Sequence, residues 1–127
     1  MAALIDAARA AHERAYAPYS QFKVGAAVLA GGRLFSGVNV ENASYGLTIC
    51  AERSAIYSAV SAGERRVDAV AIVTDTDTPT PPCGACRQVL REFGPDLLVI
   101  SATKAGTHVT HRLSELLPGS FGPENLT

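Results

Sequence analysis

Three cysteines lie where helices are predicted to begin, and their spacing constrains the fold more than any other feature of the sequence. Cys50 opens one helical segment, and Cys83 and Cys86 open another, which starts 33 positions further along the chain. Residues three apart share a helix face, and the positive N-terminus of a helix favours thiolate over thiol. Three thiolates that converge from two helix ends would make a zinc site. The segment between them must therefore bring both helix starts to one edge of a sheet.

The hydrophobic pattern predicts helices and strands in alternation. Helices are expected over residues 2–16, 48–62 and 83–93, with Thr48 as an N-cap and Gly63 as a stop. Strands are expected over residues 22–30, 34–40, 67–74, 97–102 and 108–113, with a Gly31-Gly32 turn joining the first two and a helical turn at 113–117. This order predicts an α/β fold, a three-layer α/β/α sandwich around a mixed sheet of about five strands.

Length and composition fit one globular domain, residues 1–127. The chain is 47% hydrophobic and 18% charged, which is typical of a folded protein. Its net charge is −1 and its basic residues are scattered, so no nucleic-acid partner is expected. No apolar run approaches the ~20 residues of a membrane span, and the N-terminus lacks a signal-peptide pattern. We therefore expect no membrane partner and a cytoplasmic location, where an odd number of cysteines favours metal binding over disulfides.

The number of candidate ligands distinguishes two kinds of zinc site. A structural site takes four protein ligands, whereas a catalytic site takes three and leaves a position for water. The chain has three cysteines, so a fourth ligand would have to be a histidine. His108 and His111 fall in a predicted strand and His12 on the polar face of a predicted helix, and all three are expected to be surface residues.

Charged residues stand directly beside the predicted zinc ligands. Glu52 follows Cys50 by two positions, and residues i and i+2 do not share a helix face. Its carboxylate is therefore expected to act on a substrate and not on the metal. Three thiolates outweigh the charge of Zn²⁺, so Arg53 and Arg87 are expected to donate hydrogen bonds to the sulfurs and to withdraw part of the negative charge.

The cysteines and Glu52 form a motif, Cys50-Ala51-Glu52 followed by Pro82-Cys83-Gly84-Ala85-Cys86. In this motif the chain resembles the zinc nucleoside and nucleobase deaminases. Further segments make it similar to the small cytidine deaminases in particular, and the resemblance covers nearly the whole chain. These segments are residues 22–27, 37–45 and 116–121.

The resemblance implies an activity and a role for individual residues. The activity is zinc-dependent hydrolysis of cytidine and deoxycytidine to uridine and deoxyuridine plus ammonia, as in pyrimidine salvage. One Zn²⁺ per chain would be held by the three cysteines, and Glu52 would shuttle protons. Phe22 would pack near the nucleoside, and the backbone N–H of Ala51 would meet the base carbonyl. Asn39 and Glu41 would hold the sugar hydroxyls.

The resemblance also implies an assembly. Many relatives place a histidine where Cys50 stands, so the cysteine here suggests the all-cysteine branch, whose members are homotetramers. Tyr45 and Phe121 would then reach into the active site of a neighbouring subunit.

Two alternatives remain open. A deaminase of another small amine, such as a blasticidin-type antibiotic or a free base, would share the zinc motif. A free-base enzyme would not need Asn39 and Glu41, whose side chains point the same way on an extended segment and suit hydroxyl groups. A non-catalytic zinc-binding module would need a fourth ligand and would have no use for Glu52.

Overall fold

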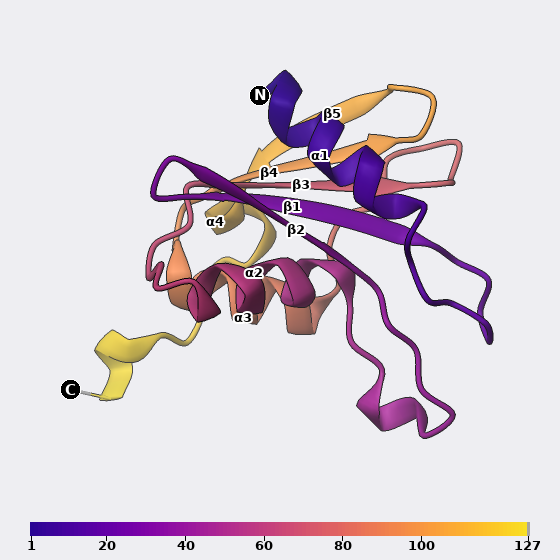
Figure 1. Ribbon diagram of the computed structural model, residues 1–127. Helices are drawn as coiled ribbons and strands as arrows, with labels where there is room; N and C mark the ends of the chain where they lie inside the picture. Colours follow the sequence, from indigo (N-terminus) through magenta and orange to yellow (C-terminus); the bar gives the residue numbers. More distant parts are fainter. Residues whose placement is uncertain (127) are drawn as a thin grey trace.

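A mixed five-stranded sheet forms the centre of the computed structural model, which describes residues 1–126 (Figure 1). The strands are β1 (Val24–Ala30), β2 (Arg33–Val38), β3 (Ala69–Thr74), β4 (Leu98–Thr103) and β5 (His108–Arg112). Their order is β2-β1-β3-β4-β5, with β3 parallel to β4 and every other neighbouring pair antiparallel. The predicted mixed sheet is confirmed. Thr127, the last residue of the expected domain, lies outside the described residues.

Helices cover both faces of the sheet. α1 (Ala2–His12) lies on one face, and α2 (Ala51–Ser61) and α3 (Gly84–Phe93) lie on the other, which confirms the three-layer sandwich (Figure 1). The short α4 (Leu113–Leu116) follows β5, as predicted from the sequence. Two 3₁₀ turns, η1 (Tyr45–Leu47) and η2 (Pro123–Leu126), were not predicted.

A two-residue turn made of glycines connects β1 and β2 in the predicted hairpin. Ala30 pairs with Arg33, so the connection has two residues. These are Gly31 and Gly32, with φ of 59° and 75°. Two successive positive φ angles match the right-handed twist of the flanking strands, and glycine adopts them without strain.

Small residues let the helices lie close against the sheet. A Cβ on Gly37 of β2 would stand 2.4 Å from the backbone nitrogen of Ala55 in α2. A Cβ on Gly25 of β1 would stand 2.2 Å from the backbone oxygen of Ala8 in α1. Both glycines therefore permit a helix backbone to approach a strand directly. At Gly37 this contact fixes the distance between α2 and the sheet.

Two predicted helix boundaries are wrong, because the chain pairs as strand just outside each helix. α1 was expected to continue to Tyr16, but Tyr16 forms a parallel bridge with Val40. α2 was expected to begin at Thr48, but Ile49 exchanges two 3.0 Å backbone hydrogen bonds with Val40 and is extended. The N-cap of α2 is Cys50. The predicted stop at Gly63 is confirmed by its φ of 100°.

His12 is not the surface residue that the sequence suggested. Its side chain is buried, with 1% of the residue exposed, at the end of α1. Its Nε2 atom lies 3.0 Å from Oδ1 of Asp75 and its Nδ1 atom 3.6 Å from Oε1 of Glu13. His12 therefore meets Asp75 in the loop that follows β3, whereas Asp6 and Glu13 of the same helix face are exposed to solvent.

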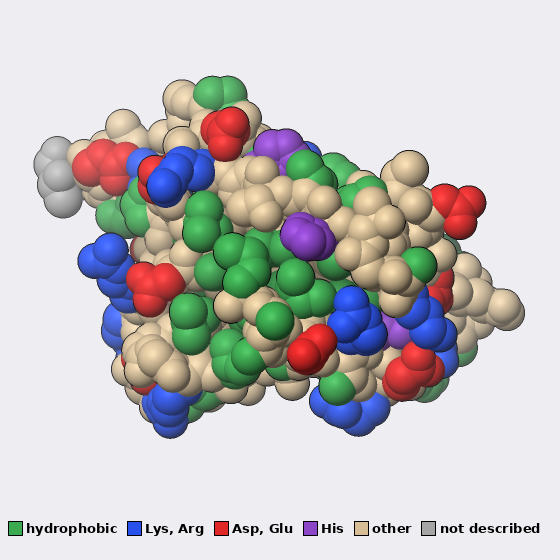
Figure 2. Space-filling view, turned by 90° about the horizontal axis from the view of Figure 1, so that it is seen from above, with side chains coloured by type: hydrophobic (Ala, Val, Ile, Leu, Met, Phe, Trp, Pro, Cys, Tyr) green, Lys and Arg blue, Asp and Glu red, His purple; other side chains and the backbone are tan. Residues whose placement is uncertain are grey.

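The surface on the α1 side carries no single-sign patch. Lys and Arg side chains are interspersed with Asp and Glu around the rim of this face (Figure 2). Among the described residues, none of the helices has the length and hydrophobicity that crossing a membrane requires.

Candidate active site and metal centre

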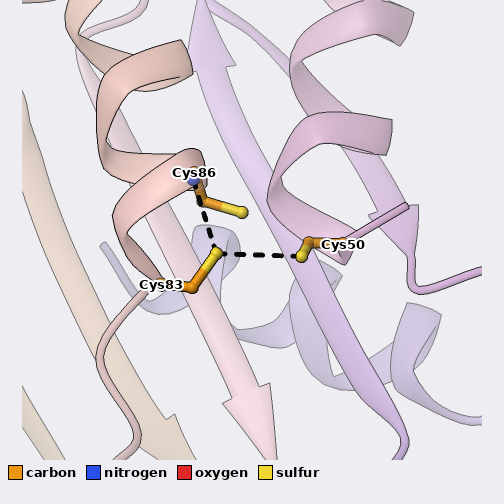
Figure 3. A group of neighbouring side chains, drawn as sticks. All are labelled: Cys50, Cys83 and Cys86. Carbon is orange, nitrogen blue, oxygen red and sulfur yellow. Dashed lines mark hydrogen bonds between the residues drawn. The ribbon is translucent and has the colours of Figure 1, made fainter. Parts of the chain in front are cut away.

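The three cysteines converge at the N-terminal ends of two helices. Cys50 is the N-cap of α2, Cys83 is the N-cap of α3, and Cys86 lies in the first turn of α3 (Figure 3). The Cys50 and Cys83 sulfurs are 3.9 Å apart, and all three sulfurs lie within 4.8 Å of one another. The predicted convergence of the cysteines is therefore confirmed.

The donor set fits a zinc ion. Four ligands placed tetrahedrally at a Zn–S distance of ~2.3 Å would leave their sulfurs ~3.8 Å apart. The observed 3.9 Å between Cys50 and Cys83 is close to that spacing. Within residues 1–126, only these three cysteines form a group of potential metal ligands of this kind, and no histidine joins it. Three thiol ligands without a fourth match the ligand count of a catalytic site.

Local hydrogen bonds stabilise charge on Cys50. The Nη2 atom of Arg53 donates to the Cys50 sulfur at 3.4 Å, one helical turn away. The Cys86 thiol and the Arg53 guanidinium together lower the pKa of Cys50 to about 5. Cys86 is the donor toward the Cys50 thiolate and is fully buried, so its own pKa is raised. The expected hydrogen bond from Arg53 to a cysteine sulfur is therefore present.

Glu52 lies beside the cysteines but outside the ligand group. It stands in the first turn of α2, and only 5% of the residue is exposed. Burial raises the pKa of its carboxyl group, and the nearby negative charge of Cys50 raises it further. A buried carboxyl group with a raised pKa, set next to a metal site, is suited to proton transfer near neutral pH.

Glu52 and two of the cysteines share one cleft with a volume of about 220 Å³. The cleft opens near Thr74 at the carboxyl end of β3, where ligands commonly bind in α/β sheets. The wall of the cleft is mostly apolar. It includes residues that the sequence analysis assigned to the site and residues that it did not. The lining residues are Phe22, Val24, Asn39, Thr48, Ile49, Cys50, Ala51, Glu52, Ile72, Thr74, Thr80, Pro81 and Cys83.

The two residues expected to hold a sugar lie at adjoining clefts. Asn39 lines the Glu52 cleft, accepts a hydrogen bond from the Val24 N–H at 2.9 Å and donates to the Phe22 carbonyl at 2.7 Å. Glu41 lines a neighbouring cleft of about 400 Å³, and Thr48 lines both. Each side chain keeps hydrogen-bonding capacity beyond the bonds it already makes.

The other residues expected at the site differ in which cleft, if any, they line. Phe22 lines the cleft, and Ala51 contributes its backbone at the start of α2. Tyr45 lines the neighbouring cleft and is 75% exposed. Phe121 is 57% exposed and lines neither cleft, and its carbonyl accepts a 3.0 Å hydrogen bond from Gln88 on α3.

The prediction that Arg87 donates to a cysteine sulfur is wrong. Its Nε atom donates to the Pro82 carbonyl at 2.8 Å and its Nη1 atom to the Leu116 carbonyl at 2.7 Å. The side chain leaves α3 toward the loop before Cys83 and the end of α4. Arg87 therefore holds the backbone next to a ligand instead of a ligand sulfur.

Several residues of the cleft were missed by the sequence analysis. Ile72 and Thr74 come from β3, and Thr80 and Pro81 come from the loop before Cys83. No spacing relates a β3 residue to Cys50, since only the packing of the sheet under α2 brings them together. The Thr-Pro-Pro run before Cys83 was the one available signal, because it adjoins the motif.

A depression larger than the Glu52 cleft lies elsewhere on the surface. It has a volume of about 670 Å³ and lies at the start of β3, between Val67 and the end of α3 near Phe93. The residues around it include Arg65, Asp68 and Asp96 but no cysteine. Its acidic and basic side chains are mixed, so the chemistry points to the smaller cleft.

Comparisons with known proteins agree with this site. Residues 2–102 match the cytidine and deoxycytidylate deaminase zinc-binding region. A cytidine deaminase of Halalkalibacterium halodurans is 52% identical over 125 residues, or 97% of this chain and 95% of that protein. A crystal structure of cytidine deaminase from Burkholderia pseudomallei has a TM-score of 0.91 at 52% identity and covers 94% of this chain and 98% of that one. The corresponding Mycobacterium tuberculosis structure has a TM-score of 0.83 at 44% identity, covering 95% and 96%. The chain therefore belongs to the cytidine and deoxycytidylate deaminase family.

Proposed function

We propose that this protein hydrolyses cytidine and deoxycytidine to uridine and deoxyuridine, with release of ammonia. The observation that carries the proposal is the buried Glu52 carboxyl group in one cleft with Cys50 and Cys83. The relatives that match over nearly the full length are named cytidine deaminases. A role in pyrimidine salvage follows from this reaction, because it returns cytosine nucleosides to the uracil series.

Cys50, Cys83 and Cys86 hold the zinc cofactor of the family in this proposal. When bound, zinc supplies a Lewis acid that activates a water molecule for attack. Glu52 accepts a proton from that water and delivers it to the ring nitrogen next to the amino-bearing carbon. Glu52 then takes the second proton from the hydroxyl group now on that carbon and passes it to the departing amine, so that ammonia leaves and a carbonyl remains. The raised pKa of its carboxyl group suits both directions of transfer.

The rest of the cleft orients the nucleoside. Phe22 and Ile72 supply apolar wall for the base. The Ala51 N–H at the positive end of α2 donates to the base carbonyl. Asn39 and Glu41 offer the remaining donor and acceptor positions to the sugar hydroxyls.

Residues 1–127 act as one catalytic domain, and we infer that four copies assemble. Tyr45 and Phe121 are large, exposed aromatic side chains on segments that extend from the sandwich. Aromatic side chains such as these are enriched in protein interfaces relative to the rest of the surface. A homotetramer in which they complete a neighbour's site uses both residues. We also propose a cytoplasmic location, where reduced thiols remain available for zinc.

A deaminase of another small amine is the main alternative. A free base would leave the hydroxyl-binding capacity of Asn39 and Glu41 unused. A non-catalytic zinc module would require a fourth ligand, whereas the described residues offer three thiols and a buried carboxyl group beside them. The net charge of −1 favours a small molecule over a nucleic-acid strand as substrate.

The direct test is ammonia release from a panel of amines. Purified zinc-loaded protein is incubated in parallel with cytidine, deoxycytidine, cytosine, adenosine and guanine, with and without a zinc chelator. We expect turnover of cytidine and deoxycytidine only, lost on chelation and restored by added zinc. Folded, zinc-loaded protein that leaves both nucleosides unchanged would overturn the proposed function.

A further inference from the structure

Ser20 lies in the loop between α1 and β1 and lines the cleft that contains Glu41. Its hydroxyl donates a hydrogen bond to Oε2 of Glu41. The Ser20 hydroxyl oxygen also accepts a 3.0 Å hydrogen bond from the backbone N–H of Phe22. One exposed hydroxyl thus joins a carboxylate expected at the sugar to the backbone of a residue that lines the Glu52 cleft.

The direction of these bonds is fixed by their partners. A carboxylate only accepts and a backbone N–H only donates, so the single proton of the Ser20 hydroxyl points to Glu41. The N–H groups of Tyr19 and Ser20 both donate to Oε1 of Glu41, at 2.9 and 3.0 Å. Three donors therefore hold the carboxylate, which has about four acceptor positions. One acceptor position remains, on the oxygen that Ser20 contacts.

The loop is built to keep Ser20 in this place. The Gln21 N–H donates to the Ala17 carbonyl at 2.9 Å and closes the turn. Gln21 adopts a φ of 58°, which is unfavourable for a residue with a Cβ and persists where the surroundings over-determine it. The bonds of Ser20 on either side of Gln21 supply part of that constraint. Hydrogen bonds from Ser20 also lower the pKa of Glu41, so the carboxylate stays charged.

We propose that Ser20 is a positioning residue for nucleoside binding, because its hydroxyl aims the one free acceptor position of Glu41 at a sugar hydroxyl. The inference rests on the proposed function and deepens it. Ser20 itself need not touch the substrate. Without its hydroxyl, the Glu41 carboxylate keeps two backbone donors on one oxygen and can rotate about that anchor. In that variant, binding of a sugar hydroxyl would have to order the Glu41 carboxylate, which costs binding free energy, whereas the wild-type protein holds it in place before the substrate binds.

The test compares Ser20→Ala with two other variants on two substrates. Ser20→Thr keeps a hydroxyl at the same position. Ser114→Ala is the matched control, since Ser114 also donates its hydroxyl to an exposed carboxylate, that of Asp96, and neither residue lines either cleft. Steady-state kinetics are measured with cytidine and with 2′,3′-dideoxycytidine, which lacks the ring hydroxyls of the sugar. If the second compound turns over slowly, its inhibition constant against cytidine replaces KM.

We expect Ser20→Ala to raise KM for cytidine about tenfold, the loss typical of one hydrogen bond to a charged group, with kcat within about twofold. For 2′,3′-dideoxycytidine the change in KM or inhibition constant should stay below about twofold. Ser20→Thr should restore cytidine binding, and Ser114→Ala should match wild type on both compounds.

Three outcomes would overturn the inference. If Ser20→Ala leaves KM for cytidine unchanged, or weakens the binding of both compounds equally, Ser20 has no role in binding the sugar hydroxyls. A fall in kcat at constant KM would place its effect on chemistry instead of on binding. Wild-type protein that does not deaminate cytidine would be a separate result, because it removes the proposed function first and the role of Ser20 with it.

Discussion

Two features of the structure around Cys50 favour its thiolate form. As the N-cap of α2 it is extended, with φ of −77° and ψ of 155°, so its sulfur stands at the positive end of the helix. It also accepts a hydrogen bond from Arg53. Both contacts favour the thiolate in a half-buried position, which is the form that binds a metal. Cys83 repeats the arrangement at α3, where its sulfur accepts the N–H of Cys86 at 3.5 Å.

Replacing Glu52 by glutamine tests the division between ligand and proton carrier. Glu52→Gln keeps the shape of the side chain and leaves all three thiols in place. We expect folded protein with one zinc per chain and a kcat that is lower by about 10²- to 10⁴-fold, the usual contribution of a general acid or base. Zinc content by elemental analysis and ammonia release give the two readouts. Glu92→Gln, on an exposed carboxyl group of α3, is the control, and near wild-type turnover in Glu52→Gln would sink the proposed role.

For individual residues, the sequence correctly predicted the positions that a local motif defines. Cys50, Cys83 and Cys86 were found by spacing, and their convergence is confirmed. Arg53 and Arg87 each follow a residue of the motif, so the sequence treated them alike. Side-chain direction separates them, since Arg53 points back along α2 to a sulfur and Arg87 points away to the Leu116 carbonyl. That direction depends on what packs beside each helix, which no local pattern contains.

Among the elements, α2 sets the position of the site relative to the sheet, because it carries both Cys50 and Glu52. Its backbone rests on β2 at Gly37, where the amide of Ala55 lies within 2.4 Å of the position that a Cβ would occupy. Ala51, Ala55 and Ala59 are fully buried along the same side of the helix. Small residues on both partners therefore fix the distance between α2 and the sheet.

Gly37→Ala should push α2 away from β2. The added methyl group would meet backbone atoms, which cannot rotate aside, so we expect a loss of about 1–3 kcal/mol in the free energy of unfolding. Urea denaturation of zinc-loaded protein at one protein concentration measures it. Gly46→Ala is the matched control, because no described atom outside its immediate neighbours lies within 4 Å of the position that its methyl group would occupy. Equal stability of the two variants would contradict this account of the close approach.

The order of the elements along the chain and two of the strand pairings were predictable, whereas the pairings β1–β3 and β4–β5 and two helix boundaries were not. Alternation of strand and helix predicted the parallel pair β3–β4, and Gly31-Gly32 predicted the first hairpin, both of which are confirmed. The start of α2 was misplaced because Ile49 pairs with Val40, and that bridge joins segments nine residues apart through a loop. Capping preference favoured Thr48, but its Oγ1 atom accepts the Asn42 N–H instead, at 3.1 Å.

At the scale of the whole molecule, the segment that carries Phe121 is held against α3. Gln88 binds the Phe121 carbonyl, and Arg91 donates to the Ser120 hydroxyl at 3.0 Å and pairs with Glu124. Residues on both sides of Phe121 are thus anchored to α3, while Phe121 itself remains more than half exposed. Because α3 also carries Cys83 and Cys86, the segment has a fixed place relative to the metal site. A fixed, exposed aromatic ring is well suited to a contact with a second copy of the chain.

Subunit mixing tests whether Phe121 acts across such a contact. Phe121→Ala protein should assemble but turn over cytidine poorly, and Glu52→Gln protein should be nearly inactive because every site lacks its proton carrier. If Phe121 completes a neighbour's site, a mixed assembly contains sites that join an intact Glu52 from one chain to an intact Phe121 from the next. Activity after the two variants are unfolded and refolded together should therefore exceed the mean of the separately refolded variants, and it should approach wild type at those sites. If Phe121 serves only its own chain, every site in the mixture keeps one defect. Activity at or below that mean, with mixed assemblies verified by native mass spectrometry, would rule out the shared site.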